Sequence, residues 1–130
     1  MAVAVISSRI SSVIVSFALS PITIIYTAAA PAAGIYNSTL VDSRIVRNLL
    51  FRITNTCDQA LNVQTIGNLT NAAATAVLIG IAMPIIALTG IITVGVDLNG
   101  DDWHPYLGIQ VTVPAGVTLG TVTVEAITRS

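Results

Sequence analysis

The most polar stretch of the chain, residues 97–102, is the best candidate for binding an ion. Its oxygen ligands stand at alternate positions, Asp97, Asn99 and Asp101. Carboxylate and amide oxygens in such a spacing suit Ca²⁺. An EF-hand loop would also need a glutamate at its twelfth position, where this chain has Gly108, and Gly100 falls before the third ligand. We therefore favour an acidic turn between two strands, with the calcium site as the alternative.

An aromatic cluster, Trp103-His104-Pro105-Tyr106, follows directly. Beside carboxylates it could bind a sugar or a partner loop, but a Trp here more often closes the end of a sandwich while Tyr106 starts a strand. His104 is the only histidine, so a histidine-based metal site or a Ser-His-Asp triad would have to be built around it. Because the chain has no nucleophile elbow, we expect no enzyme, no cofactor and no small-molecule substrate.

The other reactive groups are a single cysteine and a group of arginines. Cys57 can form no intrachain disulfide and no cysteine metal cluster, and a lone Cys in an apolar chain is usually a small buried hydrophobe. Arg44, Arg47 and Arg52 lie close to Asp42 in sequence. We expect them to pair with Asp42, Asp58 or a carboxylate of a neighbouring subunit.

Charge is scarce and unevenly placed. Charged residues make up 8% of the chain and apolar residues 54%, whereas an ordinary soluble domain is about 25% charged. Residues 10–41 and 59–96 carry no charge at all. With a net charge of −1 and no Lys, the chain has no basic field for nucleic acid. Such a chain sits in lipid or hides much of its surface against copies of itself or a partner.

The two uncharged stretches are each longer than the ~20 residues of a membrane-spanning helix, so a holin-like helical hairpin is one alternative. The second stretch, however, contains Gly80, Pro84, Gly90 and Gly95. Breakers at this spacing mark the ends of strands, and Val, Ile and Thr, which favour strands, dominate throughout. No cluster of basic residues flanks either stretch to fix a membrane topology.

Alternation of apolar and polar residues predicts the strands. In residues 107–113 every odd position is apolar, and in residues 121–126 the apolar side is Val122, Val124 and Ala126. Further strands are predicted at residues 13–19, 21–26, 47–53, 61–65, 76–81 and 91–96, with 61–65 as the hairpin partner of 47–53. Seven to nine short strands with little helix describe an all-β fold, a single antiparallel β-sandwich or jelly-roll-like domain.

From Gly34 onward, several short motifs follow one another in an order that resembles a known group of domains. The segments that carry it are residues 34–38, 41–43, 48–53, 55–64, 67–68, 102–113 and 120–127. In this order they resemble the small β-sandwich domains of phage virion proteins, including capsid decoration and tail-associated modules, and of some microbial surface proteins. The resemblance implies a structural or binding role with no catalytic residues. Residues 1–33 depart from it and are expected to be an extended N-terminal arm or an added strand pair, with residues 34–130 as the sandwich.

These observations predict a structural subunit of a virion, a capsid decoration (cement) protein on the virion surface. Its partners would be copies of itself, as a trimer or a lattice, and the major capsid protein or another structural protein. An extracellular filament or surface-layer subunit assembled by strand exchange is the alternative. The residues expected at the interfaces are Val13, Val15, Phe17, Ile22, Ile24, Tyr26, Trp103 and Tyr106. The strands at 107–113 and 120–127 should form the rigid centre.

Overall fold

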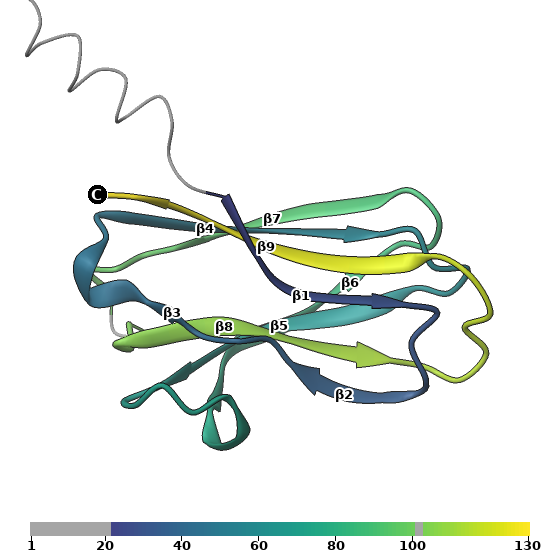
Figure 1. The fold of residues 1–130 in the computed structure, drawn as a ribbon, viewed down its shortest axis with the longest axis horizontal. Helices are drawn as coiled ribbons and strands as arrows, with labels where there is room; N and C mark the ends of the chain where they lie inside the picture. The colour runs from purple at the N-terminus through teal and green to yellow at the C-terminus, as the bar shows by residue number, and fades with distance from the viewer. Residues whose placement is uncertain (1–21, 101–102) are drawn as a thin grey trace, which may run out of the picture.

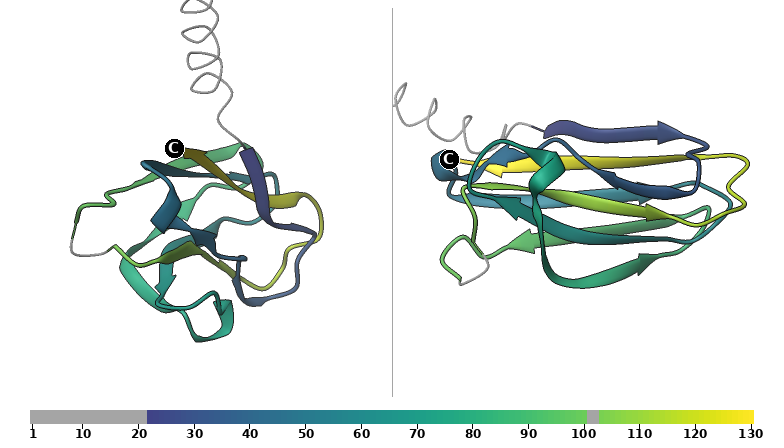
Figure 2. Two further views of the ribbon diagram at one scale, coloured as in Figure 1. Left: turned by 60° about the vertical axis from the view of Figure 1, so that its left-hand side comes forward. Right: turned by 90° about the horizontal axis from the view of Figure 1, so that it is seen from below.

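The computed structural model describes residues 22–100 and 103–130, which fold into two antiparallel β-sheets packed face to face (Figures 1 and 2). Sheet A has the strand order β1-β9-β4-β7, and sheet B the order β2-β8-β5-β6, with the short β3 also paired to β8. The strands are β1 (Ile22–Ala29), β2 (Gly34–Asn37), β3 (Val41–Asp42), β4 (Asn48–Asn55), β5 (Leu61–Asn68), β6 (Val77–Ile85), β7 (Gly90–Val96), β8 (Tyr106–Val113) and β9 (Thr121–Arg129). Two 3₁₀ turns, η1 (Ser43–Ile45) and η2 (Ala73–Thr75), complete the described elements.

The topology is that of a jelly roll. The antiparallel pairs β5–β6, β4–β7, β2–β8 and β1–β9 are nested, so the chain runs as one long hairpin that is rolled into two sheets. This confirms the predicted sandwich. The predicted hairpin between residues 47–53 and 61–65 is wrong, because β4 pairs with β7 and β9 whereas β5 pairs with β6 and β8. Strands β4 and β5, which are neighbours in the sequence, therefore lie in different sheets.

Alternation places one face of each strand in a single core between the sheets. In β8 the odd positions Leu107 to Val113 are buried, as predicted, and in β9 the buried residues are Val122, Val124 and Ala126. Leu49, Phe51 and Ile53 of β4 contribute in the same way. Both β8 and β9 have a hydrogen-bonded strand on each side, which makes them central strands of their sheets.

The sandwich includes part of the segment expected to be an N-terminal arm. Within residues 1–33, residues 22–29 are strand β1, which pairs along the length of β9 at the edge of sheet A. The described part of that segment is therefore an edge strand of the sandwich, which agrees with the alternative of added strands for this part. Residues 1–21 lie outside the described residues. Among the described residues, no helix is long and apolar enough to cross a membrane.

A buried asparagine at the end of β4 joins three parts of the fold. The side-chain amide of Asn55 donates to the carbonyl oxygens of Gln59 and Ile86, both at 3.0 Å, and its oxygen accepts the N–H of Cys57 at 2.9 Å. The turn after β4 is thereby tied to the β6–β7 turn. Because the Asn55 side chain is fully buried, water cannot replace these partners.

We expect Asn55→Ala to lower the free energy of unfolding by about 2–4 kcal/mol, because it leaves several buried backbone groups without partners. Urea denaturation of the full chain measures this. The matched control is Asn62→Ala on the exposed face of β5, which should change stability by about 0.5 kcal/mol or less. Equal effects of the two substitutions would contradict the role given to Asn55.

Candidate assembly interface

A two-sheet sandwich has four sheet edges, and three of them are protected here. β1 carries a register shift between Ile24 and Tyr26, and the N–H of Thr39 donates to the carbonyl of Ile25 at 3.1 Å across this edge. The β2/β3 edge is short and interrupted at Ser38, whose hydroxyl oxygen accepts the N–H of Ile109 at 2.9 Å. Short strands and bulges keep an edge from pairing with other chains.

The third protected edge is β6. It contains Pro84, which has no N–H to donate, and the register shift opposite Val63 and Thr65 forms a bulge at Gly80. β7 has none of these features. Its seven residues pair with β4 without a register shift, and they include no proline and no charged side chain. Among the described strands, β7 is the one long, regular edge without protection.

The surface around this edge is apolar. We call strands β6 and β7 with the turn between them the β6–β7 flank. Residues 77–96 contain no charged side chain. The large exposed apolar residues of the flank are Val77, Leu78, Ile81, Ile86, Leu88 and Ile91. Ile81 is 81% exposed. The flank therefore exposes large apolar side chains of the kind that a monomeric protein would normally bury.

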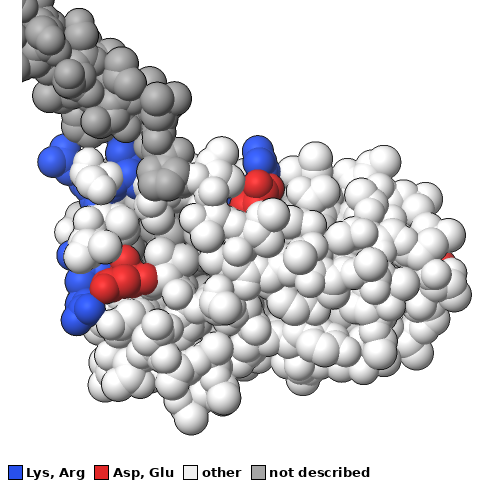
Figure 3. All heavy atoms as spheres, in the orientation of Figure 1, with Lys and Arg blue, Asp and Glu red and all other residues white. Residues whose placement is uncertain are grey.

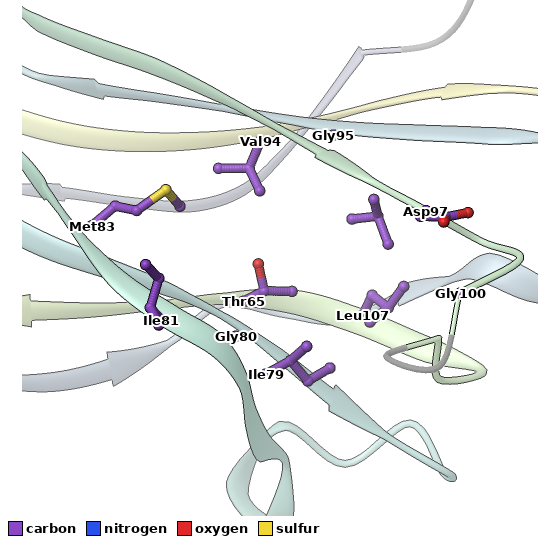
Figure 4. A pocket seen from close by; sticks show the side chains of 11 residues that line it. Thr65, Ile79, Gly80, Ile81, Met83, Val94, Gly95, Asp97, Gly100 and Leu107 are labelled. Carbon is purple, nitrogen blue, oxygen red and sulfur yellow. The ribbon is translucent and has the colours of Figure 1, made fainter.

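A cleft of about 560 Å³ lies between β6 and β7 (Figure 4). Ile79, Ile81 and Met83 line it from β6, and Val94 and Val96 from β7. Thr65 and Leu107 contribute from the neighbouring strands of sheet B, while Asp97 and Gly100 lie where β7 ends. Ile79, Met83 and Val94 are half-buried and pack against the core, so the cleft is a place where the core is left uncovered.

The cleft is closed at the end where β7 begins. There the Asn55 amide holds the β6–β7 turn, and Gly90 comes so close to that turn that a Cβ would lie 2.3 Å from the Ile86 carbonyl oxygen. On the opposite flank the Thr39–Ile25 hydrogen bond and the stacked rings of Tyr26 and Tyr36, whose centroids lie 6.0 Å apart, join the two sheets, and a smaller hollow of about 310 Å³ lies beside β1 and β3. Among the described residues no hydrogen bond joins β6 to β7, so no hydrogen bond between these two strands holds the sheets together along this flank.

The predicted interface residues are spread over several surfaces. Ile22 and Ile24 of β1 are 56% and 59% exposed, while Tyr26 is half-buried against Tyr36. Val13, Val15 and Phe17 lie outside the described residues. The β6–β7 flank was missed, although the chain signals it: a long uncharged stretch contains, at residues 90–96, a strand without the residues that protect an edge.

The aromatic cluster lies beside an ion pair. Tyr106 begins β8, as predicted, and its hydroxyl accepts a hydrogen bond of 2.9 Å from Arg44. Trp103 is 37% exposed and does not close the end of the core. His104 packs on Gly67, where a Cβ would lie 2.7 Å from the imidazole ring. The cluster thus fixes η1 and the start of β8.

The Asp97 turn is organised by its own backbone. The Asp97 carboxylate accepts the N–H of Asn99 at 3.0 Å, and its carbonyl accepts the N–H of Gly100 at 3.1 Å. Asp101 lies outside the described residues. Among those described, no three His, Cys, Asp or Glu side chains are grouped to hold a metal. The described part of the segment has the geometry of the acidic turn that the sequence favoured.

Several charged side chains are paired with near neighbours. Asp42 and Arg44 form a pair with an N–O distance of 2.8 Å, and the Arg44 guanidinium holds the pKa of Asp42 below its usual range. Arg52 and Glu125 pair directly across β4 and β9 through two hydrogen bonds of 3.1 Å. In Figure 3 most charged side chains gather at the end of the sandwich where the chain terminates and in one small group at the top, with a little acidic surface at the opposite edge, and most of that face is uncharged.

Comparison with known proteins finds a distant structural similarity. No family model and no curated protein matches the chain. Among solved structures, the crystal structure of PirA is similar with a TM-score of 0.48 and 14% sequence identity, covering 83% of this chain and 93% of that one. A likeness at this level carries no argument about function.

Cys57 is a buried, free thiol, and we expect it to be inert in the folded protein. Burial, together with the nearby Asp58 carboxylate, raises the pKa of the thiol, so the reactive thiolate is disfavoured. Dithionitrobenzoate at pH 8 should find no reactive thiol in the native protein and one per chain in denaturant. As pH rises through the ordinary thiol value of 9.0, the unfolded state loses its proton first, so stability should fall; Cys57→Ala should lack this contribution. Rapid labelling of the native protein would contradict this account.

Proposed function

We propose that this chain is a non-enzymatic structural subunit that associates with copies of itself through the β6–β7 flank. The observation that carries the proposal is the coincidence, on this flank, of an unprotected edge strand, an apolar cleft and exposed large apolar residues. Burying apolar surface drives association at about 25 cal/mol per Å², and a free edge adds backbone hydrogen bonds. Because the net charge is −1, electrostatic repulsion between two copies of the chain is weak.

We propose that this assembly lies on the surface of a virion. There the chain would act as a decoration protein bound to the major capsid protein. Two points support this setting. The segments from Gly34 onward resemble virion β-sandwich domains, and the jelly roll recurs in viral capsid proteins. Both are analogies at the level of fold, which many functions share.

An extracellular filament is the second candidate. The observation that favours it is the position of β1 and β7 at opposite edges of sheet A. A contact that uses two different surfaces of a subunit is heterologous, and repetition of such a contact gives a ring or an open filament.

Self-association is tested by charge substitution on the flank. We expect Ile81→Lys combined with Ile91→Lys to raise the dissociation constant for self-association at least tenfold, because each buried ammonium would lose its hydration without a partner. Analytical ultracentrifugation of the full chain over a concentration series measures this. The control pair, Ile45→Lys with Leu119→Lys, changes exposed apolar residues outside the flank and should leave association unchanged. An unaltered protein that stays monomeric at all concentrations would contradict the proposal.

Cryo-electron microscopy of particles from the native source decides between the two settings. We expect copies of this chain in closed clusters on an icosahedral shell, bound to the capsid protein. A continuous helical array made of this chain alone would reject the decoration role and establish the filament.

A further inference from the structure

The cleft between β6 and β7 lies beside the unprotected edge of β7. We propose that residues 13–19 of a second copy fill it, added as a strand antiparallel to β7. This inference rests on the self-association proposed above and names the segment and the site that carry it.

The acceptor offers both parts of a strand-addition site. β7 presents a row of unpaired backbone groups over seven regular residues. Beside it, the half-buried side chains of Ile79, Met83 and Val94 lack a covering layer (Figure 4). In strand addition, main-chain hydrogen bonds supply affinity while alternate side chains enter pockets.

The sequence of residues 13–19 has the matching pattern. Val13, Val15, Phe17 and Leu19 alternate with Ile14, Ser16 and Ala18. The segment has seven residues, as β7 has, carries no charge, and is followed by Pro21, which a paired strand would not continue through. If Val15 lies opposite Val94, then Phe17 lies opposite Ile92, and all four alternate apolar residues face the cleft.

The reach of the chain indicates that the segment comes from another copy. The pairings Ile22–Ile127, Ile127–Leu50 and Leu50–Gly95 place Ile22 and Gly95 in one row across sheet A. In an antiparallel addition Leu19 would lie beside Gly90, about 17 Å along the strands from that row, and about 19 Å across the sheet from Ile22, because four strand spacings separate β1 from the added strand. The straight-line distance is about 25 Å, but the three residue steps from Leu19 to Ile22 span at most about 11 Å. A chain therefore cannot place this segment in its own cleft in this register.

The direction of the contact follows. The donor leaves from the β1 edge and the acceptor lies at the β7 edge, so each subunit would give its segment to the next and receive one from the previous subunit. Such head-to-tail exchange closes into a ring or continues as a filament.

Disulfide trapping between two different variants tests the inference. One full-length variant carries Ser16→Cys and the other Thr93→Cys, two positions on the outward side of the proposed pair. Directly paired strand residues lie within the Cα separation that a disulfide needs. Mild oxidation of the mixture should give a cross-linked heterodimer in at least tenfold higher yield than a mixture of Ser16→Cys with Thr27→Cys. Thr27 is an exposed residue on the opposite edge of the same sheet, and the native Cys57 is buried.

Aspartate substitutions in the donor give an independent readout. Val15→Asp with Phe17→Asp should raise the dissociation constant for self-association at least tenfold. Ile14→Asp with Ala18→Asp adds the same charge on the outward side and should have a much smaller effect.

The outcomes separate the two proposals. If the protein associates, but neither the specific cross-link nor the sensitivity to Val15→Asp with Phe17→Asp is found, the strand addition is wrong and self-association stands. A further variant carries both Ser16→Cys and Thr93→Cys in one chain. If only this variant forms the cross-link, and forms it within one chain, each copy closes its own cleft and the inference is overturned. A protein that is monomeric at every concentration overturns the proposed function itself.

Discussion

The constraint on which this structure depends is that two open sheets must end in four edges. Each edge strand leaves backbone N–H and C=O groups without partners, and these must meet water, a side chain or another strand. Three edges are handled within the chain, by the shift in β1, the break between β2 and β3, and Pro84 with the bulge in β6. β7 forms the other edge of sheet A without any of these features. The core of the sandwich is therefore complete, whereas the outer backbone groups of β7 have no partner strand within the described fold.

The contact that gives this edge its shape is the buried amide of Asn55. By holding the β6–β7 turn through the carbonyl of Ile86, it fixes the two edge strands at one end, where Gly90 also allows close approach. Toward Asp97 nothing comparable joins β6 to β7 within the described residues, so the right-handed twist of the two sheets can separate them there. The cleft is thus a consequence of sheets joined at one end of a flank and free at the other.

Alternation in the sequence was sufficient to find the strands but not their partners. The patterns at residues 107–113 and 121–126 identified β8 and β9 and their buried faces, because burial on one side of a strand repeats every second residue. The partner of residues 47–53 was misassigned because pairing in a jelly roll joins distant segments: Phe51 lies beside Val94 and Ala126. The buried position of Asn55 depends on its contact with Ile86, thirty-one residues away in the sequence. No local pattern contains that information.

The positions of the few charged residues can be compared with the positions of the sheet edges. Asp42 is paired with Arg44 and Glu125 with Arg52, and Asp58 accepts the N–H and the hydroxyl of Thr118 to hold the loop before β9. These carboxylates are therefore occupied in fastening the sandwich, and none lies on β6 or β7 to repel an approaching strand. Monomeric proteins commonly protect such an edge with a charge or a proline. Residues 90–96 carry neither a charge nor a proline and lie beside a cleft lined by core side chains, so β7 is the edge left open to the strand addition proposed above.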